Sequence, residues 1–261
     1  MGQALLSGLR EAGVPGTHLL VVEANGAKRR LVARRYQVRC STAERLAPAC
    51  DVILLAVKPQ DTAPVLASLG AAMAHQAVAR RPLILSIAAG LRIASLQRTL
   101  GRCPLIRVMP NLPAKVGCGI SAIAAGRWAT PAHRRLARAI FESVGEVVEL
   151  PERCFDTVTA ISGSGPAYFF LIFQALRDAG RAGGLPKSVA QRLAIHTALG
   201  SSLLAKQSTD ALETMMAQVA SKKGTTEAAL KVFARRKLAD ILKAGVRAAQ
   251  RRSQELTRFL S

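Results

Sequence analysis

Aromatic side chains are scarce in this sequence, which holds one Trp, two Tyr and seven Phe in 261 residues. Proteins that bind single-stranded nucleic acid stack bases on aromatic rings interleaved with basic groups. Positive charge is abundant, with 37 Lys and Arg against 16 Asp and Glu, yet five of the ten aromatic residues crowd one segment, 155–173. Charge alone is weak support for nucleic-acid binding. We therefore expect an Arg-rich surface in solvent and no nucleic-acid partner.

Cysteine and histidine are also few and carry no metal or disulfide pattern. The five cysteines include no C-x-x-C pair, and the four histidines lack metal-ligand spacing. We expect no metal ion and a reducing compartment. The first residues lack the basic and apolar regions of a secretory signal, which favours a cytoplasmic protein.

Long uncharged runs are limited to one stretch, 157–176, which reaches the length of a membrane span. It contains Ser162, Gly163, Ser164, Gly165 and Pro166. These residues favour a loop followed by a buried helix, so we expect no membrane partner.

Short apolar runs alternate with helical stretches over the first 150 residues. The runs occupy residues 18–23, 51–57, 81–89, 104–110 and 145–150. Helical spacing lies between them, at 27–36, 62–74 and 130–144. Runs of Val, Ile and Leu without polar alternation are typical of a parallel sheet that is covered on both faces.

The pattern changes after residue 157, beyond which no strand is expected. Helices are predicted at 166–184, 186–205, 209–221 and along most of 225–260. The fold class is therefore an α/β Rossmann-like domain followed by an all-α domain. We place the α/β domain at residues 1–152 and the helical domain at 153–261.

Glu23 lies at the end of the second expected strand of the α/β domain, 21 residues after Gly2. An acid at this place can accept hydrogen bonds from the ribose hydroxyls of NAD, whereas NADP favours nearby positive charge. Lys28, Arg29 and Arg30 follow closely. The choice between NADH and NADPH therefore stays open.

Six segments occur in the order and spacing of one enzyme family. They are "MGQALLSGL", "LLAVKPQ", "SIAAGL", "RVMPNLPAKVGCGISAI", "ISGSGPAYFF" and "SKKGTTEAAL". Over essentially its whole length the sequence resembles the pyrroline-5-carboxylate reductases. The resemblance implies reduction of 1-pyrroline-5-carboxylate to L-proline with NADPH or NADH, the last step of proline synthesis.

The sequence departs from the family at its start. The family begins with a strand and the motif G-x-G-N-M-[GA], of which Met1 and Gly2 match the last two positions. We expect the first strand and most of the phosphate-binding glycine loop to be absent from this chain. The alternative function is therefore a catalytically impaired, truncated remnant that still dimerises.

The resemblance also assigns residues to the cofactor. Lys58 is expected beside the nicotinamide ribose or carboxamide, and the turn at 109–111 is expected to border the nicotinamide. The cofactor-binding residues are then Gly2, Glu23, Ala56, Val57, Lys58, Pro59, Ala88, Ala89 and Asn111.

For the substrate, the resemblance implies a carboxylate held by backbone N–H groups at the start of a helix. The substrate-binding residues are Ser221, Gly224, Thr225 and Thr226. Thr226, the catalytic candidate, orients the ring nitrogen. The family has Pro and Gly where this chain has Lys222 and Lys223, and we expect the second change to hinder a positive φ at position 223.

The resemblance finally implies an assembly. The helical domain is the family's dimerisation unit, with helices of two subunits interleaved, so we expect a homodimer or a larger homo-oligomer. The active site then combines one subunit's cofactor crevice with a helical loop of its partner. The strongly apolar "PAYFFLIF" agrees with a helix that another subunit covers.

Overall fold

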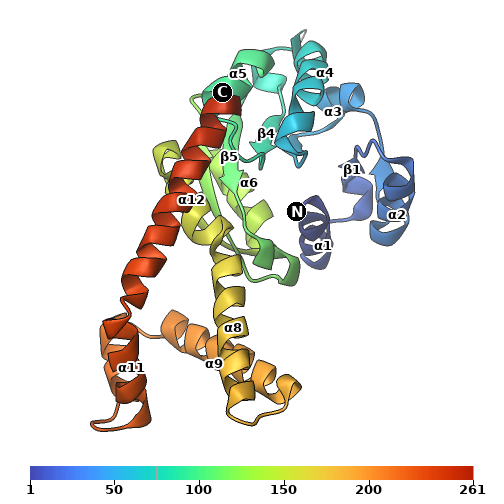
Figure 1. Cartoon of the computed structure of the whole chain (residues 1–261). Coiled ribbons are helices and arrows are strands. Elements are labelled where there is room, and N and C mark those ends of the chain that lie inside the picture. Colours follow the sequence, from blue (N-terminus) through green and yellow to red (C-terminus); the bar gives the residue numbers. More distant parts are fainter. Residues whose placement is uncertain (75, 261) are drawn as a thin grey trace. The chain divides into compact units, whose positions relative to one another are not determined.

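The computed structural model describes residues 1–74 and 76–260. The chain divides into two compact units, one of Met1–Ser164 with Ala249–Ser261 and one of Gly165–Ala248. Figure 1 shows the helices and strands of both units. The boundary placed at residues 152 and 153 from the sequence stays a prediction.

Unit 1 contains a five-stranded sheet whose strands lie in chain order. They are β3 (Val52–Leu55), β4 (Leu83–Ser86), β5 (Leu105–Met109), β6 (Gly119–Ala125) and β7 (Gly145–Glu149). The first three are parallel, and β7 is parallel to β6. However, β6, which the sequence did not predict, is antiparallel to β5. The predicted strand β7 therefore also runs opposite to the first three strands, and the sheet predicted to be parallel is mixed.

A second, smaller sheet pairs β1 (Leu20–Val21) with β2 (Arg39–Cys40) in parallel. Helix α2 (Gly26–Tyr36) makes the crossover between them. In the described part of the chain, neither strand is hydrogen-bonded to the larger sheet. A small core of Val32, Tyr36 and Val38 supports this pair.

Helices cover both faces of the larger sheet. Helices α1 (Gly2–Glu11) and α6 (Pro131–Glu142) pack on one face. The other face carries α3 (Ala43–Ala49), α4 (Thr62–Ala74) and α5 (Ile93–Leu100). Helix α4 has the bounds predicted from its spacing.

Strand β4 shows why the apolar runs lack polar alternation. All four of its residues are buried. Leu83 and Leu85 enter the core under α1 and α6, while Ile84 enters the core under α4 and α5. A strand covered on both faces must present apolar groups to each of them.

The segment after β7 is helical rather than a loop. Helix α7 (Phe155–Val158) continues into a π-helical turn at Thr159–Gly163, and α8 (Gly165–Ala182) starts two residues later. The loop predicted at residues 162–166 was therefore wrong. The hydroxyls of Thr159 and Ser162 donate to backbone carbonyls four residues earlier, which fits this widened turn.

Short 3-10 helices occupy Gly16–His18, Pro59–Asp61, Val78–Arg80, Leu112–Val116 and Glu152–Cys154.

Unit 2 is entirely helical in its described residues. It contains α8, α9 (Lys187–Gln207), α10 (Leu212–Val219), α11 (Thr225–Arg235) and the first part of α12 (Leu238–Leu260). Helix α8 packs closely against α9. A methyl group placed on Gly180 would lie only 2.9 Å from the Cβ of Ala190. Figure 1 shows these two helices in yellow and orange.

The long helix predicted over 225–260 is broken between α11 and α12. Lys237 adopts a left-handed backbone with φ of 53°, and its carbonyl accepts from Asp240 and Ile241 to start α12. Neither glycine nor proline marks this position in the sequence. The sequence pattern alone therefore did not indicate this break in the helix.

Helix α8 exposes an apolar face within this single chain. Phe169, Phe170 and Leu171 are 56%, 58% and 67% exposed. The helix predicted to be buried is therefore exposed on this face in a single subunit. Large apolar patches of this kind mark surfaces that a partner covers. Among the described residues no helix combines the length and apolar character needed to cross a membrane.

Candidate active site

Three parallel strands of unit 1 end at one edge of the sheet. Leu55 lies opposite Ser86, and Ser86 lies opposite Arg107. Three segments expected at the cofactor lie at these strand ends: 56–59 after β3, 87–90 after β4, and 109–111, which starts at the last residue of β5. Ligands of open α/β sheets bind outside the carboxyl ends of the strands, so this edge is the candidate cofactor site.

The start of α1 lies at the same edge. A methyl group placed on Gly2 would lie 3.4 Å from the Cβ of Ala56. No side chain caps the N-terminus of this ten-residue helix. The backbone N–H groups of Gly2 and Gln3 can therefore meet a phosphate oxygen.

Two of the expected cofactor residues carry backbone or side-chain bonds that shape this edge. The carbonyl of Lys58 accepts from the Thr62 hydroxyl at 3.0 Å, and its side chain lies in solvent just before the 3-10 turn that begins at Pro59. Asn111 is buried, and its Oδ1 accepts from the N–H of Ile120 at 2.9 Å. Only the amide nitrogen of Asn111 is then left to donate to a cofactor.

Glu23 follows β1, a strand of the smaller sheet. One of its carboxylate oxygens accepts from the N–H of Asn25 at 2.9 Å. Asn25 in turn caps α2, because its Oδ1 accepts from the N–H of Lys28 at 3.0 Å. The acid predicted to bind ribose is therefore tied into the N-cap of α2.

Two arginines fold back over this helix start. A methyl group placed on Gly26 would lie 3.7 Å from Nη1 of Arg30 and 4.0 Å from Nη2 of Arg29. Both residues are exposed. Two guanidinium groups at a helix N-terminus form an anion site, because charge and helix dipole act in the same sense.

The expected substrate loop in unit 2 is a tight turn that opens α11. The N–H of Gly224 donates to the carbonyl of Ser221 at 2.9 Å. No side chain caps α11, whose N-cap residue is Gly224. The first N–H groups of the helix, those of Thr225 and Thr226, are thus available to an anion.

Lys223 corrects the expectation about this turn. Its φ is 60°, the left-handed value that the replacement of glycine was expected to hinder. A carboxylate oxygen of Glu227 accepts a hydrogen bond from the Lys223 N–H, which helps to hold this backbone. Left-handed backbone costs a non-glycine residue about 1–2 kcal/mol, so the turn keeps its shape at some cost.

Glu227 stays charged beside the loop. The hydrogen bond from Lys231 holds the pKa of its carboxyl below the usual value, and the Lys223 N–H acts in the same direction. Its charge lies in the first turn of α11, where an acid is favourable. Lys231 forms an ion pair with it, which reduces its repulsion of a bound carboxylate.

The sequence did not indicate a further contact at the cofactor edge. A methyl group placed on Gly163 would lie 2.8 Å from Cε of Met109. The π-helical turn therefore lies directly against the residue that ends β5. The glycine-rich motif around Gly163 was the only available signal, and it was interpreted as a loop.

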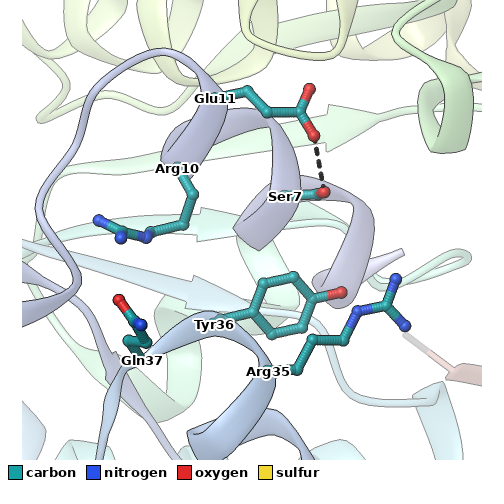
Figure 2. A pocket seen from close by; sticks show the side chains of 6 residues that line it. All are labelled: Ser7, Arg10, Glu11, Arg35, Tyr36 and Gln37. Carbon is teal, nitrogen blue, oxygen red and sulfur yellow. Dashed lines mark hydrogen bonds between the residues drawn. The ribbon is translucent and has the colours of Figure 1, made fainter.

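One surface cavity, of about 310 Å³, lies away from the expected cofactor residues. Figure 2 shows that it opens between α1 and the end of α2, and it is lined by Ser7, Arg10, Glu11, Arg35, Tyr36 and Gln37. Here both helices present their C-terminal turns. Carbonyl groups at helix C-termini attract cations, and Arg10 already donates to the carbonyl of Val14 at 2.8 Å.

Comparisons with known proteins match both parts of the chain. Residues 1–90 match the family described as "NADP oxidoreductase coenzyme F420-dependent", and residues 152–256 match "Pyrroline-5-carboxylate reductase dimerisation". A pyrroline-5-carboxylate reductase of Synechocystis is 42% identical over 98% of this chain and 94% of its own length. That of Pseudomonas aeruginosa is 38% identical over 100% and 94%.

Solved structures give the same result. The pyrroline-5-carboxylate reductase of Coxiella burnetii superposes with a TM-score of 0.92 at 29% identity, over 98% of this chain and 94% of that one. The Plasmodium falciparum pyrroline carboxylate reductase, solved with NADP bound, gives 0.85 at 28% identity over the same shares. This chain belongs to the pyrroline-5-carboxylate reductase family.

Proposed function

We propose that the chain reduces 1-pyrroline-5-carboxylate to L-proline with NADPH or NADH as hydride donor. The observation that carries this proposal is the uncapped start of α11 behind the tight Ser221–Gly224 turn. A small ring carboxylate needs backbone N–H donors and one oriented hydroxyl, and residues 224–226 offer both. The chain acts as a homodimer or larger homo-oligomer, in agreement with its dimerisation segment.

The residues at the edge of the larger sheet fit a dinucleotide. Gly2 and Gln3 hold the pyrophosphate through their N–H groups, while Lys58 and the amide nitrogen of Asn111 hold the nicotinamide end. Ala56, Val57, Ala88 and Ala89 shape the surface against which it lies. When bound, the reduced nicotinamide supplies the hydride that adds to C5 of the imine.

The substrate loop orients the imine. N–H groups of Thr225 and Thr226 hold the carboxylate, while the Gly224 N–H, which donates to the Ser221 carbonyl, keeps the turn and these donors in place. The Thr226 hydroxyl hydrogen-bonds the ring nitrogen and supplies or relays its proton. An iminium carbon is already electrophilic, so positioning and exclusion of water are the main demands on the protein.

The start of α2 favours NADPH over NADH. Arg29 and Arg30 fold over the N-terminus of α2 and suit the 2′-phosphate of NADPH. Glu23 is held by Asn25, which limits its access to a free ribose. We place the cofactor-binding domain at residues 1–152, the dimerisation and substrate-loop domain at 153–261, and the protein in the cytoplasm.

Thr226 provides the test of this assignment. We expect Thr226→Val to lower kcat for pyrroline-5-carboxylate roughly 100-fold, the lower range for loss of a proton-transferring group, because the ring nitrogen loses its partner. The KM for NADPH should not change. Steady-state oxidation of NADPH, followed by its absorbance, measures both quantities.

Thr226→Ser is the matched control, since it keeps the hydroxyl. It should stay within a few-fold of the original kcat. If Thr226→Val retained the kcat of the unaltered enzyme, the role given to this hydroxyl would be wrong.

A further inference from the structure

Arg107 is a charged residue in the middle of the larger sheet. It lies on β5 between Ser86 of β4 and Ala124 of β6, and it is 5% exposed. Its Nη1 donates to Oε1 of Glu152 at 3.0 Å, and its guanidinium carbon lies 4.9 Å from the centre of the Phe155 ring. Ion pairs in such places stabilise little more than apolar groups of equal volume.

Glu152 uses the same oxygen to hold a second segment. Its Oε1 accepts from the N–H of Ile93 at 2.8 Å, in the first turn of α5. That helix has no side-chain cap at its own N-cap residue. One carboxylate oxygen thus joins β5, the start of α5 and the 3-10 turn that leads into α7.

Each joined segment leads to the cofactor edge. Arg107 lies two residues before Met109, and Ile93 lies three residues after Gly90. From Phe155 the chain enters α7 and the π-helical turn that ends at Gly163. Gly163 lies close to the side chain of Met109, so the π-helical turn packs against the end of β5.

We propose that Arg107 and Glu152 form a positioning pair for hydride transfer. The pair sets the spacing between the 87–90 loop, the 109–111 turn and the π-helical turn, and it touches no reacting atom itself. This inference rests on the proposed function, in which Asn111 holds the nicotinamide end and Ala88 and Ala89 shape the surface against which the cofactor lies. Displacement of a reacting group by about 1 Å can lower a rate 100-fold.

The test uses Arg107→Met combined with Glu152→Gln. The double variant leaves no unpaired buried charge, and the glutamine oxygen can still accept from Ile93. We expect kcat at saturating NADPH and pyrroline-5-carboxylate to fall 10- to 100-fold. The Kd of NADPH, measured by fluorescence titration, should change less than threefold. The primary isotope effect on kcat with 4-deuterated NADPH should rise, because hydride transfer becomes slower relative to product release.

The matched control is Arg134→Met with Glu149→Gln. That pair joins α6 to β7 in the same unit at 2.8 Å, but both side chains lie largely in solvent. Its removal should leave kcat and the isotope effect unchanged. A folded Arg107/Glu152 double variant with unchanged kcat and isotope effect, and only a lower Tm, would overturn the proposal. Failure of the unaltered enzyme to oxidise NADPH would instead overturn the proposed function.

Discussion

Gly224→Ala should reduce kcat/KM for pyrroline-5-carboxylate by roughly 100- to 1,000-fold, the loss seen when one hydrogen-bond donor of an oxyanion site is removed. The new methyl group would lie 2.3 Å from Oγ of Ser221 and 2.9 Å from its carbonyl oxygen. Neither distance is tolerable, so the Ser221–Gly224 turn must open. The N–H groups of Thr225 and Thr226 then lose their common direction. Steady-state kinetics with varied substrate measure the loss.

Lys223→Gly is the matched control for this turn. Glycine accepts the left-handed backbone at position 223 without steric cost, so substrate turnover should be kept within a few-fold and Tm should rise. Circular dichroism of both variants separates local from global effects. If Gly224→Ala folded and kept its kcat/KM within about threefold, the carboxylate could not be bound by the N–H groups of this loop.

Removal of the Arg29 and Arg30 side chains should weaken the use of NADPH and leave the use of NADH nearly unchanged. We expect the combined Arg29→Ala and Arg30→Ala variant to raise the KM for NADPH about 10- to 100-fold, since each hydrogen bond to a charged group contributes about 1.5–3 kcal/mol before solvent exposure reduces it. The KM for NADH should change less than twofold, because NADH lacks the 2′-phosphate. Parallel titrations with both cofactors give the ratio.

The same helix supplies the control. Arg34→Ala combined with Arg35→Ala removes equal charge from the last turn of α2. If this variant raised the KM for NADPH as strongly as the Arg29/Arg30 variant, the effect would be caused by the loss of net charge. An equal loss for NADPH and NADH would likewise contradict a specific 2′-phosphate site.

Much of the α/β unit could be predicted from apolar runs, since β3, β4, β5 and β7 all lie within them. Strand β6 was missed because Gly119–Ala125 is mostly small residues without β-branched enrichment. Its antiparallel direction follows from the short turn after β5, in which Asn111 binds Ile120. That turn depends on a side chain whose partner the sequence does not reveal.

The local backbone of the site could not be predicted from residue types alone. Lys223 adopts a left-handed backbone, and Glu227, four residues later, accepts a hydrogen bond from its N–H and so helps to hold this conformation. The π-helical turn at Thr159–Gly163 likewise contains the Gly and Ser that favour a loop in isolation. In both places a neighbouring contact overrides the intrinsic preference.

The buried pair of Arg107 and Glu152 shows a further limit. The two residues lie 45 positions apart and carry no motif of their own. Their meeting depends on the register of β5 beside β4, which only the folded sheet determines. By contrast, the residues of the cofactor edge could be proposed early, since they follow parallel strands whose ends must coincide.

The most direct measurement of the central claim is the transfer of deuterium from NADPH that carries deuterium at both C4 positions, so that either face of the nicotinamide delivers the label. The enzyme is incubated with the labelled cofactor and pyrroline-5-carboxylate, and the proline formed is analysed by mass spectrometry. The account predicts proline that carries a single deuterium at C5, in amounts equal to the NADPH oxidised. A folded, oligomeric protein that formed no labelled proline would contradict it and favour the alternative of a remnant that only dimerises.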